Sequence, residues 1–143
     1  MPRIDFYVLS DTAPEARLKT ACRIVEKAYG AGQKVYIRTA GEADSQAIDN
    51  LLWTYSDQSF VPHEIAAGGP VSHDRIAALI GTGPAPAPYR QVLVNLTDIM
   101  PTESDSVERI VEIVDADPER KRLARDRFRT YRERGCVLET HNL

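Results

Sequence analysis

The pattern of apolar and polar positions divides the first third of the chain into alternating strands and helices. Residues 6–10, FYVLS, are aromatic and β-branched, which is typical of a strand. Residues 34–39, KVYIRT, predict a second strand. Each is followed by residues at helical spacing, and the order strand, helix, strand, helix favours a parallel sheet covered by helices.

Both helices in this part have a predicted apolar stripe. The first should begin at a capping box, in which Thr12 precedes Glu15 by three residues with Pro14 in the first turn, and should end at the GAG of residues 30–32. The second covers residues 42–53, EADSQAIDNLLW. The predicted buried positions are Leu18, Ala21, Cys22, Val25, Ala28 and Tyr29 in the first helix, and Ala47, Ile48, Leu51 and Leu52 in the second.

The second half of the chain predicts further strands and one long helix. Residues 76–81 and 91–96 are apolar enough for strands, and the second of these could be buried on both faces. Residues 107–114 fit either a strand or a helix stripe, and their β-branched density favours a strand. Asp117 and Pro118 supply an N-cap and a first turn for a helix that runs to about Arg134. The tail of residues 136–143 could add a short strand.

Length and composition indicate an ordinary globular protein. A chain of 143 residues, with 27% charged and 43% hydrophobic residues, is the size of one domain, so we expect a single domain over residues 1–143. No apolar run approaches the ~18 residues that span a bilayer, and the first residues do not resemble a signal peptide. We therefore expect a cytoplasmic protein without membrane contact. Cys22 and Cys136 are most simply small buried hydrophobic residues.

Motifs of catalysis, cofactor binding and metal binding are weak or missing in the sequence. Residues 81–86, GTGPAP, resemble a dinucleotide fingerprint, but the prolines remove amide donors and oppose the helix that would hold a pyrophosphate. There is no P-loop motif and no G-x-S-x-G motif. The three histidines, at positions 63, 73 and 141, have no metal-ligand spacing. We expect no catalytic site, no cofactor and no metal.

The last long helix is a basic island on an acidic body. The chain has a net charge of −3, yet residues 119–134 contain eight Lys or Arg and three acids. The rest of the chain, with ten bases and 18 acids, therefore carries −8. At ~100° per residue, one face of roughly 100° contains no acid and includes Lys121, Arg125, Phe128, Arg129 and Arg132. The opposite side should anchor the helix through Leu123, Ala124, Thr130 and Tyr131, with the aliphatic stem of Arg127 reaching outward.

Three interpretations of this basic face are open. It could be a solvated charged face. It could bind nucleic acid, because cations neutralise phosphates and Phe128 could stack on a base. It could also bind an acidic peptide with a hydrophobic anchor, with Phe128 lining a pocket and the cations pairing with carboxylates. The acidic body would repel a long nucleic acid, so the charge distribution favours the peptide.

A second unusual stretch is LLWTYSDQSFVPH, residues 51–63, which places Trp53 and Phe60 among polar residues. Large aromatic side chains in such a stretch either close the core beneath the second helix or contact a partner. Aromatic residues dominate binding hot spots, which favours the partner.

The order of these segments resembles the chi subunit family of bacterial DNA polymerase III holoenzyme. The resemblance covers nearly the whole chain, and its most specific parts are LLW followed by SFVPH, and the helix LARDRFRTYRERG. It implies a three-layer, Rossmann-like α/β fold with a mostly parallel sheet and no bound nucleotide. It also implies a non-catalytic accessory protein of the clamp loader.

The resemblance implies two partner sites. One would bind the acidic C-terminal tail of single-stranded-DNA-binding protein through Lys121, Arg125, Phe128 and Arg129, with Arg132 steering from the periphery. The other would bind the psi subunit, or an accessory helicase, through Trp53, Phe60, Val61 and Pro62. Nucleic acid would then be reached only indirectly. The rival hypotheses are a nucleotide-dependent enzyme on a doubly wound sheet and direct binding of single-stranded DNA by the basic helix.

Overall fold

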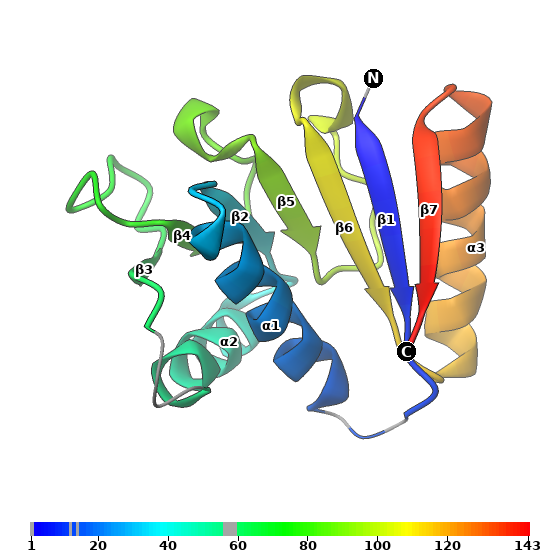
Figure 1. Ribbon diagram of the computed structural model, residues 1–143, viewed down its shortest axis with the longest axis horizontal. Helices are drawn as coiled ribbons and strands as arrows, with labels where there is room; N and C mark the ends of the chain where they lie inside the picture. The colour runs from blue at the N-terminus through cyan, green and yellow to red at the C-terminus, as the bar shows by residue number, and fades with distance from the viewer. Residues whose placement is uncertain (1, 12, 14, 56–59) are drawn as a thin grey trace.

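Seven parallel strands form a single sheet at the centre of the computed structural model, which describes residues 2–11, 13, 15–55 and 60–143 (Figure 1). The order across the sheet is β3-β4-β2-β5-β6-β1-β7, and every neighbouring pair is parallel. The strands are β1 (Arg3–Val8), β2 (Val35–Arg38), β3 (His63–Ile65), β4 (Ala78–Gly81), β5 (Val92–Asn95), β6 (Arg109–Val114) and β7 (Val137–Asn142).

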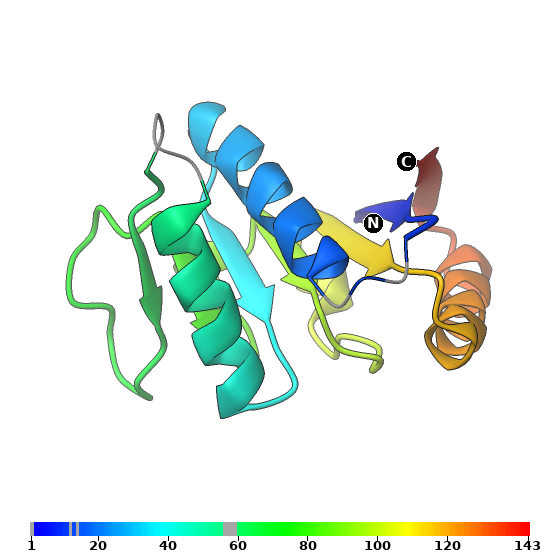
Figure 2. The same ribbon diagram turned by 90° about the horizontal axis from the view of Figure 1, so that it is seen from below.

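Helices cover both faces of the sheet. Helices α1 (Ala16–Gly30) and α2 (Glu42–Thr54) lie on one face, and α3 (Pro118–Glu133) lies on the other (Figures 1 and 2). Two short 3-10 helices, Ala87–Tyr89 and Ser104–Ser106, lie in the loops on either side of β5. The protein is therefore a three-layer α/β fold of the Rossmann-like type with an all-parallel sheet, as the sequence predicted.

The alternation of side chains along the central strands divides the core into two halves. In β2, Val35 and Ile37 pack with α1 and α2, whereas Tyr36 packs with the cluster beneath α3. In β5, Val94 packs on the side of α1 and α2, and Leu93 packs on the side of α3. Strands buried on both faces are apolar almost throughout, which is why the sequence of β5 reads as a continuous apolar run.

Most of the predicted elements are confirmed. The ambiguous segment is strand β6, the C-terminal tail forms β7, and the side chain of Asp117 caps α3 by accepting a hydrogen bond from the backbone N–H of Arg120 at 2.8 Å. The three-residue strand β3 was not predicted, because it is too short to show alternation. No helix in the described part of the chain is long and apolar enough to cross a membrane.

The predicted helix faces need two corrections. Ala47 is exposed because the inward face of α2 is formed by Ser45, Ile48 and Leu52. Tyr29, in the last turn of α1, is 40% exposed. The predicted capping box falls partly outside the described residues, at positions 12 and 14. The N-cap residue of α1 is Glu15, which makes no side-chain capping hydrogen bond.

Packing explains the first glycine of GTGPAP. A Cβ atom at Gly81 would collide with the hydroxyl of Tyr36, which donates a 2.7 Å hydrogen bond to the carbonyl of Gly83. The chain then enters a proline-rich loop and a 3-10 helix at Ala87–Tyr89, so no α-helix begins where a pyrophosphate would bind.

Candidate partner-binding sites

A groove with an apolar floor lies between α3 and the edge of the sheet. It encloses about 260 Å³. Helix α3 contributes Lys121, Arg125 and Phe128 to its walls, three of the five residues predicted for the acidic-tail site. The remaining lining residues are Phe6, Val8, Val114, Ala124 and Thr140, from strands β1, β6 and β7 and from α3 itself. We call this feature the α3 groove.

Phe128 forms one wall of the α3 groove. Its ring is half-buried and meets Phe6 edge to face, with the ring centroids 5.2 Å apart. The sequence predicted an exposed ring that lines a pocket; the ring does line the groove, but it is less exposed than expected, because Phe6 from β1 packs against it. A ring with one side packed and the other facing a groove is held in one orientation and still available to a ligand.

The cations around the groove differ in how far they are neutralised by the protein itself. No ion pair among the described residues includes Lys121, Arg125 or Arg132. Arg129 lies 3.8 Å from the carboxylate of Asp126. Asp126 is outside the acid-free face predicted from the sequence, but its side chain is close enough to pair with Arg129. Two cations without an internal partner, Lys121 and Arg125, therefore line the groove itself.

Helix α3 is fixed to the sheet by a buried ionic network. The guanidinium of Arg127 donates two hydrogen bonds to the carboxylate of Glu112, at 3.1 and 3.2 Å, and Tyr131 donates a third at 2.8 Å. Arg127 is only 5% exposed, so the expectation that it reaches outward is wrong. Burial raises the pKa of Glu112, and these hydrogen bonds oppose the shift. The network sets the orientation in which α3 presents its outer face.

The second predicted site is centred on an exposed aromatic pair. Trp53 is 60% exposed at the end of α2 and Phe60 is 46% exposed, and their ring centroids lie 4.9 Å apart. Exposure of this size excludes the alternative in which Trp53 closes the core. Pro62 is partly buried beside them. Val61 is 4% exposed and belongs to the α1 and α2 core, so it supports this surface from beneath. We call Trp53 and Phe60 the aromatic pair.

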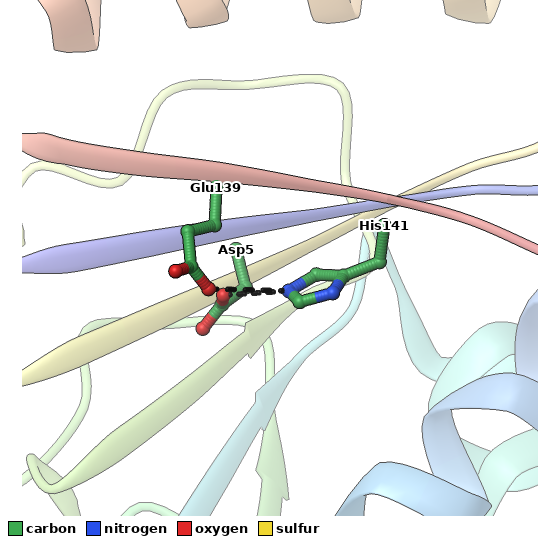
Figure 3. A group of neighbouring side chains, drawn as sticks. All are labelled: Asp5, Glu139 and His141. Carbon is green, nitrogen blue, oxygen red and sulfur yellow. Dashed lines mark hydrogen bonds and ion pairs between the residues drawn. The ribbon is translucent and has the colours of Figure 1, made fainter.

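One group among the described residues has the composition of a metal site. Asp5, Glu139 and His141 have their donor atoms within 4.8 Å of one another, on the part of the sheet that α1 leaves uncovered (Figure 3). Arg3 bridges the two carboxylates, and Arg109 donates a 2.6 Å hydrogen bond to Asp5. Burial alone would raise the pKa of Asp5, but hydrogen bonds from His141 and Arg109 outweigh it and lower that pKa. Because guanidinium groups already neutralise these carboxylates, the group is an ion-pair cluster that joins β7 to β1.

A cavity of about 480 Å³ at the carboxyl ends of the strands is where a doubly wound fold would bind a nucleotide. Its lining includes Arg17 and Arg120 but also three carboxylates, those of Asp44, Asp115 and Asp117. The guanidinium of Arg120 is already engaged by Asp115 at 3.1 Å. A lining with more acids than bases repels phosphates, which argues against the nucleotide-dependent enzyme.

Comparison with known proteins identifies the family. The profile of the family described as DNA polymerase III chi subunit, HolC, matches residues 1–139. The chain belongs to this family. It is 39% identical to the DNA polymerase III subunit chi of Pseudomonas aeruginosa, over all of this chain and 98% of the relative. It is 29% identical to the subunit chi of Haemophilus influenzae, over 96% and 95%, and 27% identical to that of Escherichia coli, over 98% and 97%. The resemblance stated from the sequence is confirmed, and the chain is an accessory subunit in DNA replication.

Some residues of this chi-family chain were missed by reasoning on α3 alone. Phe6, Val8 and Thr140 line the α3 groove from strands β1 and β7. The period of two along β1 does place Phe6 and Val8 on one face, although it does not say which helix covers that face. The sequence around Thr140 could not place this residue in the groove, because the pairing of β7 with β1 is a tertiary feature.

Proposed function

We propose that this chain is a non-catalytic adaptor with two partner sites. The α3 groove binds the acidic C-terminal tail of single-stranded-DNA-binding protein. The aromatic pair binds the psi subunit of the clamp loader or an accessory helicase. The adaptor thereby tethers the clamp loader to DNA that is coated with the binding protein.

The observation that carries the first part is the chemistry of the α3 groove. An apolar floor between Phe6, Val8 and Phe128 fits one apolar side chain, and burying such a side chain is worth about 1.5–3 kcal/mol. Lys121 and Arg125 line the same groove and pair with no acid among the residues that the structure describes, so carboxylates of a bound peptide can pair with them. An acidic segment that ends in an apolar residue matches both features.

Electrostatics set the expected strength. Exposed ion pairs contribute under about 1 kcal/mol each, so a single tail binds modestly and is weakened by salt. Many tails on one coated strand raise the effective concentration and strengthen attachment without new contacts. Arg129, which Asp126 already engages, and Arg132, outside the lining of the groove, contribute to steering more than to the contact.

The second part is supported by the exposure of two large aromatic rings side by side. Trp and Tyr are the aromatic residues most enriched among binding hot spots, and Phe is enriched at interfaces generally. The two sites occupy opposite faces of the sheet, since α2 lies on one face and α3 on the other (Figure 2). Both partners can therefore bind at once.

The test is a calorimetric titration of the tail peptide into the wild type, Arg125→Ala and Arg122→Ala. Arg122 is a matched control, because it is an exposed α3 arginine paired with Glu119 at 2.6 Å and is not part of the groove. We expect Arg125→Ala to weaken binding about fivefold, which corresponds to about 1 kcal/mol, and Arg122→Ala to leave it within twofold. Equal affinities of the wild type and Arg125→Ala would refute the assignment. Displacement of the peptide by single-stranded DNA alone would favour the direct DNA binder.

A further inference from the structure

His63 lies directly beneath the aromatic pair. It is the first residue of β3, its side chain is fully buried, and its ring centroid lies 5.0 Å from that of Trp53 and 5.6 Å from that of Phe60. The imidazole therefore contacts both exposed rings from the protein side. Any change in the ring is transmitted to the surface that a partner would contact.

Both nitrogens of this imidazole face oxygen atoms that can only accept hydrogen bonds. Nδ1 lies 2.8 Å from the carbonyl oxygen of Val61, and Nε2 lies 3.3 Å from Oδ1 of Asp49. A neutral imidazole has one N–H, so one of its nitrogens would face an acceptor with a lone pair. Nε2 is a buried atom without a geometrically satisfied hydrogen bond. The doubly protonated imidazolium is the form that can donate to Val61 from Nδ1 and still pair with the carboxylate of Asp49 through Nε2.

In the described part of the chain, the charge paired with the ring comes from α2. Asp49 belongs to α2, one turn before Trp53, and its side chain is 18% exposed. Strand β4 presents Ala78 opposite His63. Glu64, the next residue of β3, is turned to Ser72. Within the described residues, Asp49 is the one charged group paired with His63. An imidazolium here is also within the ~6 Å at which a cation is attracted to an aromatic ring.

We propose that His63 and Asp49 form a proton-dependent support for the aromatic pair, and that partner binding at this surface is coupled to protonation of His63. This inference rests on the second partner site proposed above. The protonated ring is held by Val61 and Asp49 and fixes Trp53 and Phe60 in one arrangement. Loss of the proton removes the attraction to Asp49 and loosens the aromatic pair. Binding should therefore be weaker at high pH, where the proton is lost, than at low pH.

The only tryptophan of the chain makes the support measurable without a partner. Trp53 reports on its surroundings by fluorescence, and an imidazolium quenches indole emission more strongly than an imidazole does. We expect Trp53 emission to fall as the pH is lowered from about 8 to about 5. His63→Gln should abolish the transition, whereas His73→Gln and His141→Gln should retain it. Asp49→Asn should alter the transition, because the carboxylate that pairs with the imidazolium is lost.

The absence of a transition in the wild type would overturn the proposal, and so would its persistence in His63→Gln. Should His63→Gln fail to fold, Asp49→Asn decides, because the side chain of Asp49 is partly exposed and an unchanged transition in this variant contradicts the support.

The coupling to binding is tested with recombinant psi subunit, or with the helicase if a Phe60-dependent pull-down yields that instead. We expect the wild type to bind about threefold more tightly at pH 6 than at pH 8, and His63→Gln to show a ratio near one. Equal affinities of the wild type at both pH values would overturn the inference alone. If no partner is retained at either pH, or if Phe60→Ala binds as the wild type does, the proposed second site itself is wrong.

Discussion

Replacing Arg127 with Met should destabilise the protein far more than replacing any exposed arginine of α3. Methionine keeps much of the side-chain volume but leaves the carboxylate of Glu112, which is 0% exposed, without its counter-ion. Removing one member of a buried ion pair costs about 3–5 kcal/mol. Two partners remain, since Tyr131 donates at 2.8 Å and Asn95 at 3.2 Å, so we expect the lower end of that range. This is a large fraction of a typical stability of about 5–15 kcal/mol.

Urea unfolding followed by circular dichroism measures this loss, with Arg122→Met as the matched exposed control. The double variant Arg127→Met with Glu112→Gln should be more stable than Arg127→Met alone, because no buried charge is left. Burial raises the pKa of Glu112, and a folded-state pKa above the unfolded value stabilises the fold at low pH. The cost of Arg127→Met should therefore be smaller at pH 5 than at pH 8. A loss below about 1 kcal/mol, or a double variant no more stable than Arg127→Met, would refute the assigned network.

Further predictions concern the aromatic pair, the tail site and the cysteines. Phe60→Ala should abolish capture of psi or helicase from a lysate and leave tail binding intact, while Tyr29→Ala, which removes an exposed aromatic side chain of α1, should leave both activities intact; loss of both activities in Phe60→Ala would indicate misfolding. Raising the salt concentration from about 0.05 to 0.5 M should weaken tail binding severalfold, and a salt-independent affinity would contradict carboxylate pairing at Lys121 and Arg125. Burial raises the pKa of Cys22 to about 12, so a thiol reagent at pH 8 should label Cys136 in the native protein and spare Cys22; rapid labelling of Cys22 would be inconsistent with this burial.

The sequence predicted the part of the α3 groove that lies on one helix. Lys121, Arg125 and Phe128 share a face because the geometry of an α-helix is local, and the structure brings these three to one groove. It could not predict the strands that complete the groove, because the pairing of β7 with β1 joins residues that are more than a hundred positions apart. For the same reason the packing of Phe6 on Phe128 was invisible, and the ring was expected to be more exposed than it is.

The ion pair of Arg127 was not predicted, although the sequence contains enough information to predict it. Its position in the anchoring stripe of α3 was recognised, but its partner was not. Glu112 is a single charged residue in the apolar strand RIVEIV, and such a residue requires a counter-ion when it is buried. Two charged residues of opposite sign at two positions that should both be buried predict an ion pair between them.

The most direct test of the adaptor is to determine where the tail of single-stranded-DNA-binding protein contacts the protein. A tail peptide whose apolar C-terminal residue is replaced by a photoreactive phenylalanine analogue can be cross-linked and the labelled positions read by mass spectrometry. Labelling should fall on the lining of the α3 groove, at Phe6, Val8, Phe128 or Thr140, and should decrease in Arg125→Ala but not in Arg122→Ala. Efficient labelling elsewhere, with none in the groove, would contradict the account.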